Sequence, residues 1–166
     1  MNWKEIISRK QLARKVGLVK RQPRIIRLEQ VKKVGLLWHE NDQRAFSYLQ
    51  EQFRSRSVIV RHLCFSETGN NSDSNVINKK DFNWLGFPAS GIIDTFIASD
   101  FEVLVNLTVH PCYPLEVITT LSMATLKIGW DRDKRGFLDL DIDVSKQPDS
   151  LFLAEQTLLY LQKFAQ

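Results

Sequence analysis

The sequence predicts an α/β fold, in which helices cover both faces of a mostly parallel sheet. Short apolar runs rich in Val, Ile and Leu recur along the chain, and segments of helical period separate most of them. The size agrees with one globular domain, because the chain has 166 residues, of which 43% are hydrophobic and 25% charged.

The elements alternate along the chain. We expect strands at residues 32–38, 57–65, 101–107, 125–130 and 137–144. We expect helices at residues 3–16, 42–54, 90–98, 115–123 and 149–164. The connections between the first four strands are long enough to cross over the sheet. The simplest topology is therefore a three-layer, Rossmann-like sheet of about five strands in the order 2-1-3-4-5.

The last expected strand differs from the others. Residues 137–144 alternate apolar and acidic side chains, which is typical of a strand with one dry and one wet face. The turn at 131–136 is too short for a crossover helix, so we expect this strand to be antiparallel and to lie at an edge. Asp139, Asp141 and Asp143 would then discourage edge-to-edge pairing.

The first helix and the linker after it carry most of the positive charge. Asn2 can cap this helix and Gly17 can end it. Residues 1–33 contain eleven basic and two acidic side chains, a charge of +9, whereas the remainder has 12 basic and 17 acidic ones, a charge of −5. We therefore divide the chain into a basic helix and linker, 1–30, and a single α/β domain, 31–166.

A basic arm on an acidic body favours contact with RNA or another acidic partner. The residues expected at this contact are Trp3, Arg9, Lys10, Arg14, Lys15, Lys20, Arg21, Arg24 and Arg27. The alternatives are an arm that lies on its own acidic body or is a solvated helix, and a helix on a membrane surface. The membrane alternative is the least favoured, because the apolar residues of this helix form no single stripe.

The middle of the chain contains a long polar stretch. Residues 66–80 are rich in Asn, Ser, Asp and Gly, which predicts a surface loop. Phe82, Trp84, Leu85 and Phe87 follow it. We expect this cluster to clamp the loop onto the body rather than to stack on a ligand.

A ligand site in this fold has a defined place. Ligands bind beyond the carboxyl ends of the strands where the strand order reverses, here between the first and third strands. The polar residues expected there are His39, Glu40, Asn41, Asn106, Thr108, His110 and Asp131. Cys112 with His110 is a possible nucleophilic dyad at this edge.

Several classes of protein are excluded or disfavoured. No glycine-rich phosphate loop and no G-x-S-x-G motif occurs, so no cofactor is expected. His and Cys lie near strand ends without zinc-ligand spacing, so no metal is expected. No apolar run is long enough to span a membrane. With Cys64 and Cys112 as the only cysteines, a disulfide scaffold is excluded and a cytoplasmic location is expected.

Much of the chain resembles a small uncharacterised bacterial family found in Bacteroidota. The resemblance is carried by the basic helix, the strand at 33–37, the turn at 81–86, and the stretches 100–107, 114–122, 125–130 and 159–161. It implies an α/β layout and no known activity. Asn106 stands where an Asp or Ser would be expected, so the resemblance assigns it no catalytic role.

The stretch of about 30 residues from Asp100 to Trp130 also resembles the acceptor-side domain of lipopolysaccharide heptosyltransferases. Such enzymes need a second domain for the nucleotide sugar, which this chain is too short to contain. The resemblance therefore implies common fold ancestry without a donor site.

Three functions remain open. The favoured one is a non-catalytic binding module whose basic arm contacts RNA or another acidic partner. The second is a scaffold or homo-oligomer, in which the arm packs on Asp139, Asp141 and Asp143 of another copy. The third is a binder of, or enzyme for, a sugar or phosphorylated metabolite in the crevice at Glu40 and His110. The sequence favours a non-catalytic protein over an enzyme and names no reaction.

Overall fold

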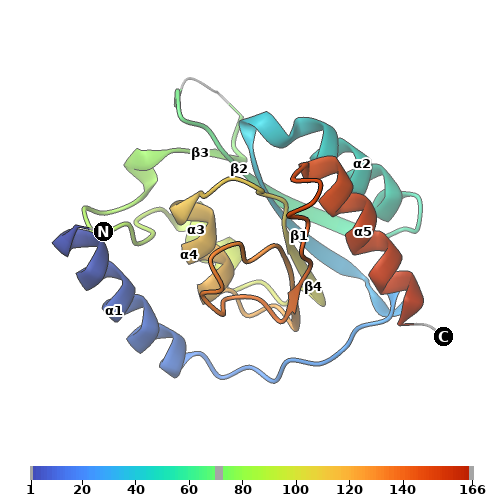
Figure 1. Cartoon of the computed structure of the whole chain (residues 1–166), viewed down its shortest axis with the longest axis horizontal. Coiled ribbons are helices and arrows are strands. Elements are labelled where there is room, and N and C mark those ends of the chain that lie inside the picture. The colour runs from blue at the N-terminus through green and yellow to red at the C-terminus, as the bar shows by residue number, and fades with distance from the viewer. Residues whose placement is uncertain (1, 70–72, 165–166) are drawn as a thin grey trace.

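A single sheet organises the chain, with helices on both of its faces (Figure 1). The computed structural model describes residues 2–69 and 73–164. The six strands lie in the order β3-β2-β1-β4-β5-β6, and every neighbouring pair is parallel. The strands are β1 (Lys33–His39), β2 (Ile59–Phe65), β3 (Val76–Ile77), β4 (Val103–Asn106), β5 (Leu126–Gly129) and β6 (Leu140–Asp141).

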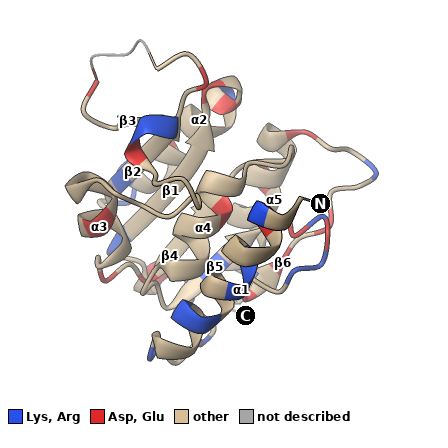
Figure 2. Cartoon of the chain, turned by 90° about the vertical axis from the view of Figure 1, so that its left-hand side faces the viewer, with Lys and Arg blue, Asp and Glu red and all other residues tan. Residues whose placement is uncertain are grey.

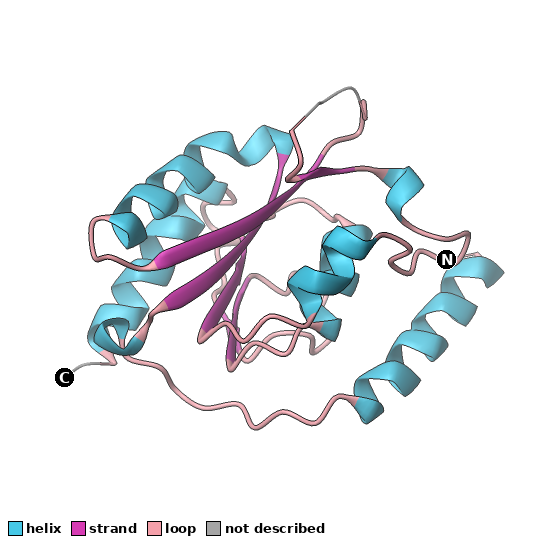
Figure 3. Cartoon of the chain, turned by 180° about the vertical axis from the view of Figure 1, so that it is seen from behind, coloured by secondary structure: helices cyan, strands magenta, loops and turns pink. Residues whose placement is uncertain are grey.

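Three layers result from the placement of the helices. The helices are α1 (Trp3–Leu18), α2 (Gln43–Arg54), α3 (Gly91–Ile97), α4 (Tyr113–Leu121) and α5 (Ser150–Lys163). Helices α2 and α5 cover one face of the sheet, α3 and α4 cover the other, and α1 lies outside α4 (Figures 1 and 3). Among the described residues, no helix is both long and apolar enough to cross a bilayer.

The predicted fold class is confirmed, with two corrections to the sheet. The predicted order 2-1-3-4-5 corresponds to β2, β1, β4, β5 and β6. The prediction of an antiparallel edge strand is wrong, because β6 pairs in parallel with β5. The sheet also has a further edge strand, β3, which lies within the stretch expected to be only a loop and pairs with β2.

The direction was wrong because β6 is shorter than the strand expected at 137–144 and begins only at Leu140, which leaves a connection long enough to cross over. The acidic side chains show why the strand is short. The carboxylate of Asp139 accepts a hydrogen bond from the main-chain N–H of Lys127 at 2.8 Å. That of Asp141 accepts one from the N–H of Asp131, also at 2.8 Å. Both carboxylates thus accept hydrogen bonds from the main chain at β5 and just after it, instead of facing solvent along a long strand. The alternation of acidic and apolar residues therefore reflects these hydrogen bonds and not a strand with one exposed face. Residues 130–139 connect β5 to β6 without a helix.

Each face of the sheet has its own apolar core. On the α2 and α5 face the core includes Leu36, Phe53 and Val105. On the α3 and α4 face the ring of Phe101 lies directly over β1 at Gly35, where a Cβ atom would be only 2.7 Å from the ring. A glycine is therefore required at that point of β1.

Helix α1 packs on the body through one face. The side chain of Asn2 accepts the N–H of Glu5 at 2.9 Å and caps the helix, as predicted, although the helix runs through Gly17 to Leu18. Leu12 is buried with Phe87 and Val117 in a small third core. The helix thus belongs to the packed structure of the chain.

The linker after α1 is extended and returns to the sheet domain. The guanidinium of Arg21 forms two hydrogen bonds to the carboxylate of Asp139, at 2.6 and 2.7 Å. It also donates to the carbonyl oxygens of Ala124 and Thr125 at 3.3 Å. Further along, Ile26 is fully buried in the core on the α2 and α5 face.

Candidate functional site

A cavity of about 430 Å³ lies at the carboxyl edge of the sheet, where strand order reverses between β1 and β4. Five of the seven residues predicted for a ligand site line it: His39, Glu40, Asn41, Thr108 and His110. The first three follow β1 and the other two follow β4, so the parallel topology brings them together.

Hydrogen bonds fix the β1 side of this cavity. Nδ1 of His39 accepts the main-chain N–H of Asn41 at 3.2 Å, and its Nε2 lies 3.6 Å from a carboxylate oxygen of Glu67. The hydroxyl of Ser66 donates to Glu40 at 2.6 Å. Beneath them, burial raises the pKa of the Asp42 carboxyl, although the N–H of His39 donates to it. This side therefore presents an imidazole and carboxyl groups to a ligand.

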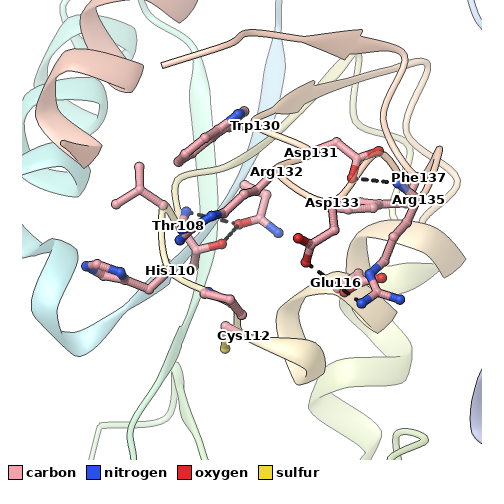
Figure 4. A pocket seen from close by; sticks show the side chains of 13 residues that line it. Thr108, His110, Cys112, Glu116, Trp130, Asp131, Arg132, Asp133, Arg135 and Phe137 are labelled. Carbon is pink, nitrogen blue, oxygen red and sulfur yellow. Dashed lines mark hydrogen bonds and ion pairs between the residues drawn. The ribbon is translucent and has the colours of Figure 1, made fainter. Parts of the chain in front are cut away.

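The other two predicted residues do not face this cavity. Asn106 and Asp131 line a neighbouring hollow of only about 50 Å³, shown in Figure 4. Asn106 accepts two hydrogen bonds from Thr108, and Asp131 accepts the main-chain N–H groups of Arg135 and Gly136. Both side chains thus shape the loops beside the cavity.

Cys112 is poorly suited to act as a nucleophile. Burial raises the pKa of its thiol to about 11, so the thiolate is scarce near neutral pH. His110 lies on the exposed loop two residues earlier. Among the described residues, no hydrogen bond joins Cys112 to His110, so the Cys–His dyad stays a prediction.

The basic arm contains two kinds of cation. Arg9 pairs with Glu5 and with Glu116 of α4, and Arg21 pairs with Asp139. Arg27 pairs with Glu29, and the ammonium of Lys15 lies 4.6 Å from the centroid of the Phe87 ring. These cations hold the arm to itself or to the body.

The remaining basic side chains of the arm are exposed, and within the described part of the chain none of them has a hydrogen bond or ion pair. They are Lys4, Lys10, Arg14, Lys20, Arg24 and Lys32; Lys33, at the start of β1, pairs with Asp100. Figure 2 shows Lys and Arg at intervals along α1, on the near side of the molecule. We call these six residues the unpaired cations.

The acidic strand expected to receive the arm of another copy is already engaged within the chain. Asp139 pairs with Arg21, and Asp141 pairs with Lys134. The arm therefore lies partly on its own acidic body, which was one of the alternatives open from the sequence.

A pair of tryptophans lies beside the N-terminal end of α1. Phe87 is 3% exposed and clamps its segment as predicted, but Trp84 of the same cluster is 62% exposed. Its ring lies against that of Trp3, which is 66% exposed, with centroids 6.4 Å apart and planes at 52°. Trp84 lines a groove of about 600 Å³, and Asn2 and Lys4, the neighbours of Trp3 in the sequence, line it too. The groove shares Lys79, Tyr113 and Pro114 with the cavity at the carboxyl edge.

The sequence favoured a clamping role for Trp84 over stacking on a ligand, but its side chain is mostly exposed. The side chain of Asn83 accepts the N–H groups of Leu85 and Phe87, and Gly86 has a φ of +88°. This tight turn points Trp84 outward while Phe87 turns in. The Asn and Gly that flank Trp84 were the available signal.

A model of a family of unknown function (DUF6913) matches residues 4–164. The chain belongs to this family. The match runs from α1 to the end of α5, so the basic helix is part of the family domain. No curated protein and no solved structure matches the chain. The expected resemblance to a family without an assigned activity is confirmed, whereas the Bacteroidota source and the likeness to heptosyltransferases stay predictions.

Proposed function

We propose that this DUF6913 protein is a non-catalytic binding module that contacts RNA through α1 and its linker. The observation that supports it most is the set of six unpaired cations on a chain whose remainder is acidic. Cations already paired within the chain contribute little to a partner's phosphates. Unpaired ones release counterions from the phosphates when they bind, which favours association.

Full-length variants test this proposal better than a truncation. Removing residues 1–30 would uncover Val117 and Phe87 and take Ile26 out of the core, so loss of binding could reflect loss of folding. Lys10→Glu with Arg14→Glu instead changes two exposed cations of α1. Arg44→Glu with Arg54→Glu is the matched control, because both are exposed cations on α2 at the opposite face.

The measurement is fluorescence anisotropy of a labelled single-stranded RNA across a salt series. The wild type should bind with a steep fall in affinity as salt increases. The α1 variant should lose at least about tenfold in affinity and reduce the log–log slope by about one to two, as expected for two lost phosphate contacts. Equal losses in the α2 control, or no binding by the wild type at low salt, would overturn the proposal.

A cytoplasmic location fits this function. Cys64 and Cys112 are both free in the structure, as thiols are in a reducing compartment. Detection of the protein with the ribosome-rich cytoplasmic fraction of lysed cells would support it, and detection in an oxidising compartment would contradict it.

A second candidate function is binding of a small polar molecule, such as a sugar or phosphorylated metabolite, at the carboxyl edge. The supporting observation is that five predicted residues line one cavity at the reversal of strand order. A thermal-shift screen should find a compound that stabilises the wild type but not Glu40→Gln or His110→Ala. Equal stabilisation of both variants and the wild type would contradict binding at this site.

A further inference from the structure

We propose that the groove beside Trp3 and Trp84 takes unpaired bases of single-stranded RNA. This inference rests on the proposed function and names its substrate class. The proposed function depends on the unpaired cations, whereas this inference depends on the aromatic pair and the groove that adjoins it.

Packing within the chain does not account for the position of Trp84. Its neighbours Phe82 and Phe87 point into the body, where Phe82 meets the ring of Phe65 and Phe87 is buried with Leu12. Trp84 contacts the ring of Trp3 from a different segment, and both remain mostly exposed. Two large aromatic side chains thus lie together on the surface beside a basic helix.

The geometry of this pair leaves ring faces open for stacking. Because the ring planes meet at 52° with centroids 6.4 Å apart, neither indole covers the face of the other. A purine or pyrimidine can lie on an open face, and such stacking is insensitive to base identity. A duplex offers no such contact, because its bases already stack on one another.

The groove supplies room and charge for the rest of the nucleotide. Its volume of about 600 Å³ lies in the range of sites that take small molecules. Lys4 lies on its α1 side and Lys79 on its other side, and both are exposed. Glu5 also lines the groove, but its carboxylate is paired with Arg9. The unengaged charge around the aromatic pair is therefore positive, which complements phosphate.

The test separates bases from phosphates. A labelled single-stranded RNA, an abasic oligonucleotide with the same number of phosphates, and a duplex of the same sequence are titrated against the wild type, Trp84→Ala and Trp3→Ala. Tyr160→Ala on α5 is the control for loss of a partly exposed aromatic ring. The wild type should bind the single strand best, with quenching of tryptophan fluorescence.

The expected result is a loss of about 10- to 100-fold in affinity for the single strand in Trp84→Ala, the range for one lost base stack. Its salt slope should be unchanged, because no phosphate contact is removed. The abasic oligonucleotide should bind weakly and equally to the wild type and Trp84→Ala, and Tyr160→Ala should match the wild type.

The outcomes distinguish failure of the stacking groove from failure of the proposed function. If Trp84→Ala binds the single strand as well as the wild type while Lys10→Glu/Arg14→Glu does not, the proposed function stands and the stacking groove is wrong. If the wild type binds no oligonucleotide, both are wrong. If it instead binds vesicles of anionic phosphatidylglycerol and Trp84→Ala does not, the surface recognises a membrane and this inference is overturned.

Discussion

The sheet domain is held together by two apolar cores, whereas the N-terminal segment is attached at a few separate points. Buried Leu12, the Arg21–Asp139 pair and buried Ile26 are its main attachments. Between these points the segment is exposed, and its unpaired cations lie there. The N-terminal segment can therefore be ordered and still bind a partner. A few side chains fix it in place, and its unpaired cations remain exposed.

The largest effect concerns Ile26, which marks where the segment joins the main core. Ile26→Ala should lower the free energy of unfolding by about 3 kcal/mol, because the side chain is fully buried. Ile25→Ala, next to it and 64% exposed, should have almost no effect. Urea unfolding of both variants checks this, and equal effects would show that the linker end is not part of the core.

The second effect concerns Lys127, which is buried beside Arg21 where the segment meets β5. Burial and the nearby guanidinium lower the pKa of its amine from the ordinary value of 10.5 to about 7. The unfolded chain therefore binds more protons between pH 7 and 10.5, and this group makes stability rise with pH across that window.

Lys127→Met should remove this pH dependence. At pH 7 the variant should be more stable than the wild type by about 2 kcal/mol, because it buries no charge and loses only the hydrogen bond to the carbonyl of Thr120. The difference between the two proteins should shrink as pH rises. Exposed Lys146→Met is the control, and a constant difference across pH 7 to 10 would contradict the account.

The third effect concerns the ion pair that fastens the linker. The side chains of Arg21 and Asp139 are 15% and 17% exposed and meet in a two-bond geometry. A double-mutant cycle of Arg21→Met and Asp139→Asn should give a coupling of about 1 kcal/mol, above that of an ordinary surface pair. Chemical unfolding measures it, and a coupling near zero would mean that the linker is held by Ile26 alone.

The smallest expected change in stability concerns Trp84, in comparison with Phe87 of the same aromatic cluster. Trp84→Ala should alter stability by less than about 0.5 kcal/mol, because the side chain is mostly exposed. Phe87→Ala, three residues away and buried, should cost about 3 kcal/mol. Thermal unfolding compares them, and a large loss in Trp84→Ala would indicate a structural role for that side chain.

β1, β4 and β5 could be predicted because they are buried along most of their length and stand out as apolar runs. β2 is buried only at residues 63–65 and was indicated by its β-branched residues. β6 was placed in the wrong direction because the strand begins at Leu140 and not at residue 137, so the connection from β5 is longer than expected and crosses over without a helix. β3 pairs through only two residues, which is too short to leave a pattern.

One candidate site could be predicted from the sequence, and the features of the others could not. The carboxyl-edge cavity could be predicted, because parallel topology alone brings the residues after β1 and β4 to one edge. Which cations are paired could not be predicted, because Arg9 and Arg21 pair with carboxylates that are distant in the sequence, those of Glu116 and Asp139. The exposure of Trp84 depends on a turn whose direction only the packed structure sets.

The proposed function requires that the unpaired cations of the N-terminal segment bind RNA phosphates. The most direct test is the dependence of RNA affinity on salt in full-length wild type, Lys10→Glu/Arg14→Glu and Arg44→Glu/Arg54→Glu. We expect a steep slope in the wild type and the α2 variant, and a shallower slope with weaker binding in the α1 variant. The same slope and affinity in all three proteins would contradict it.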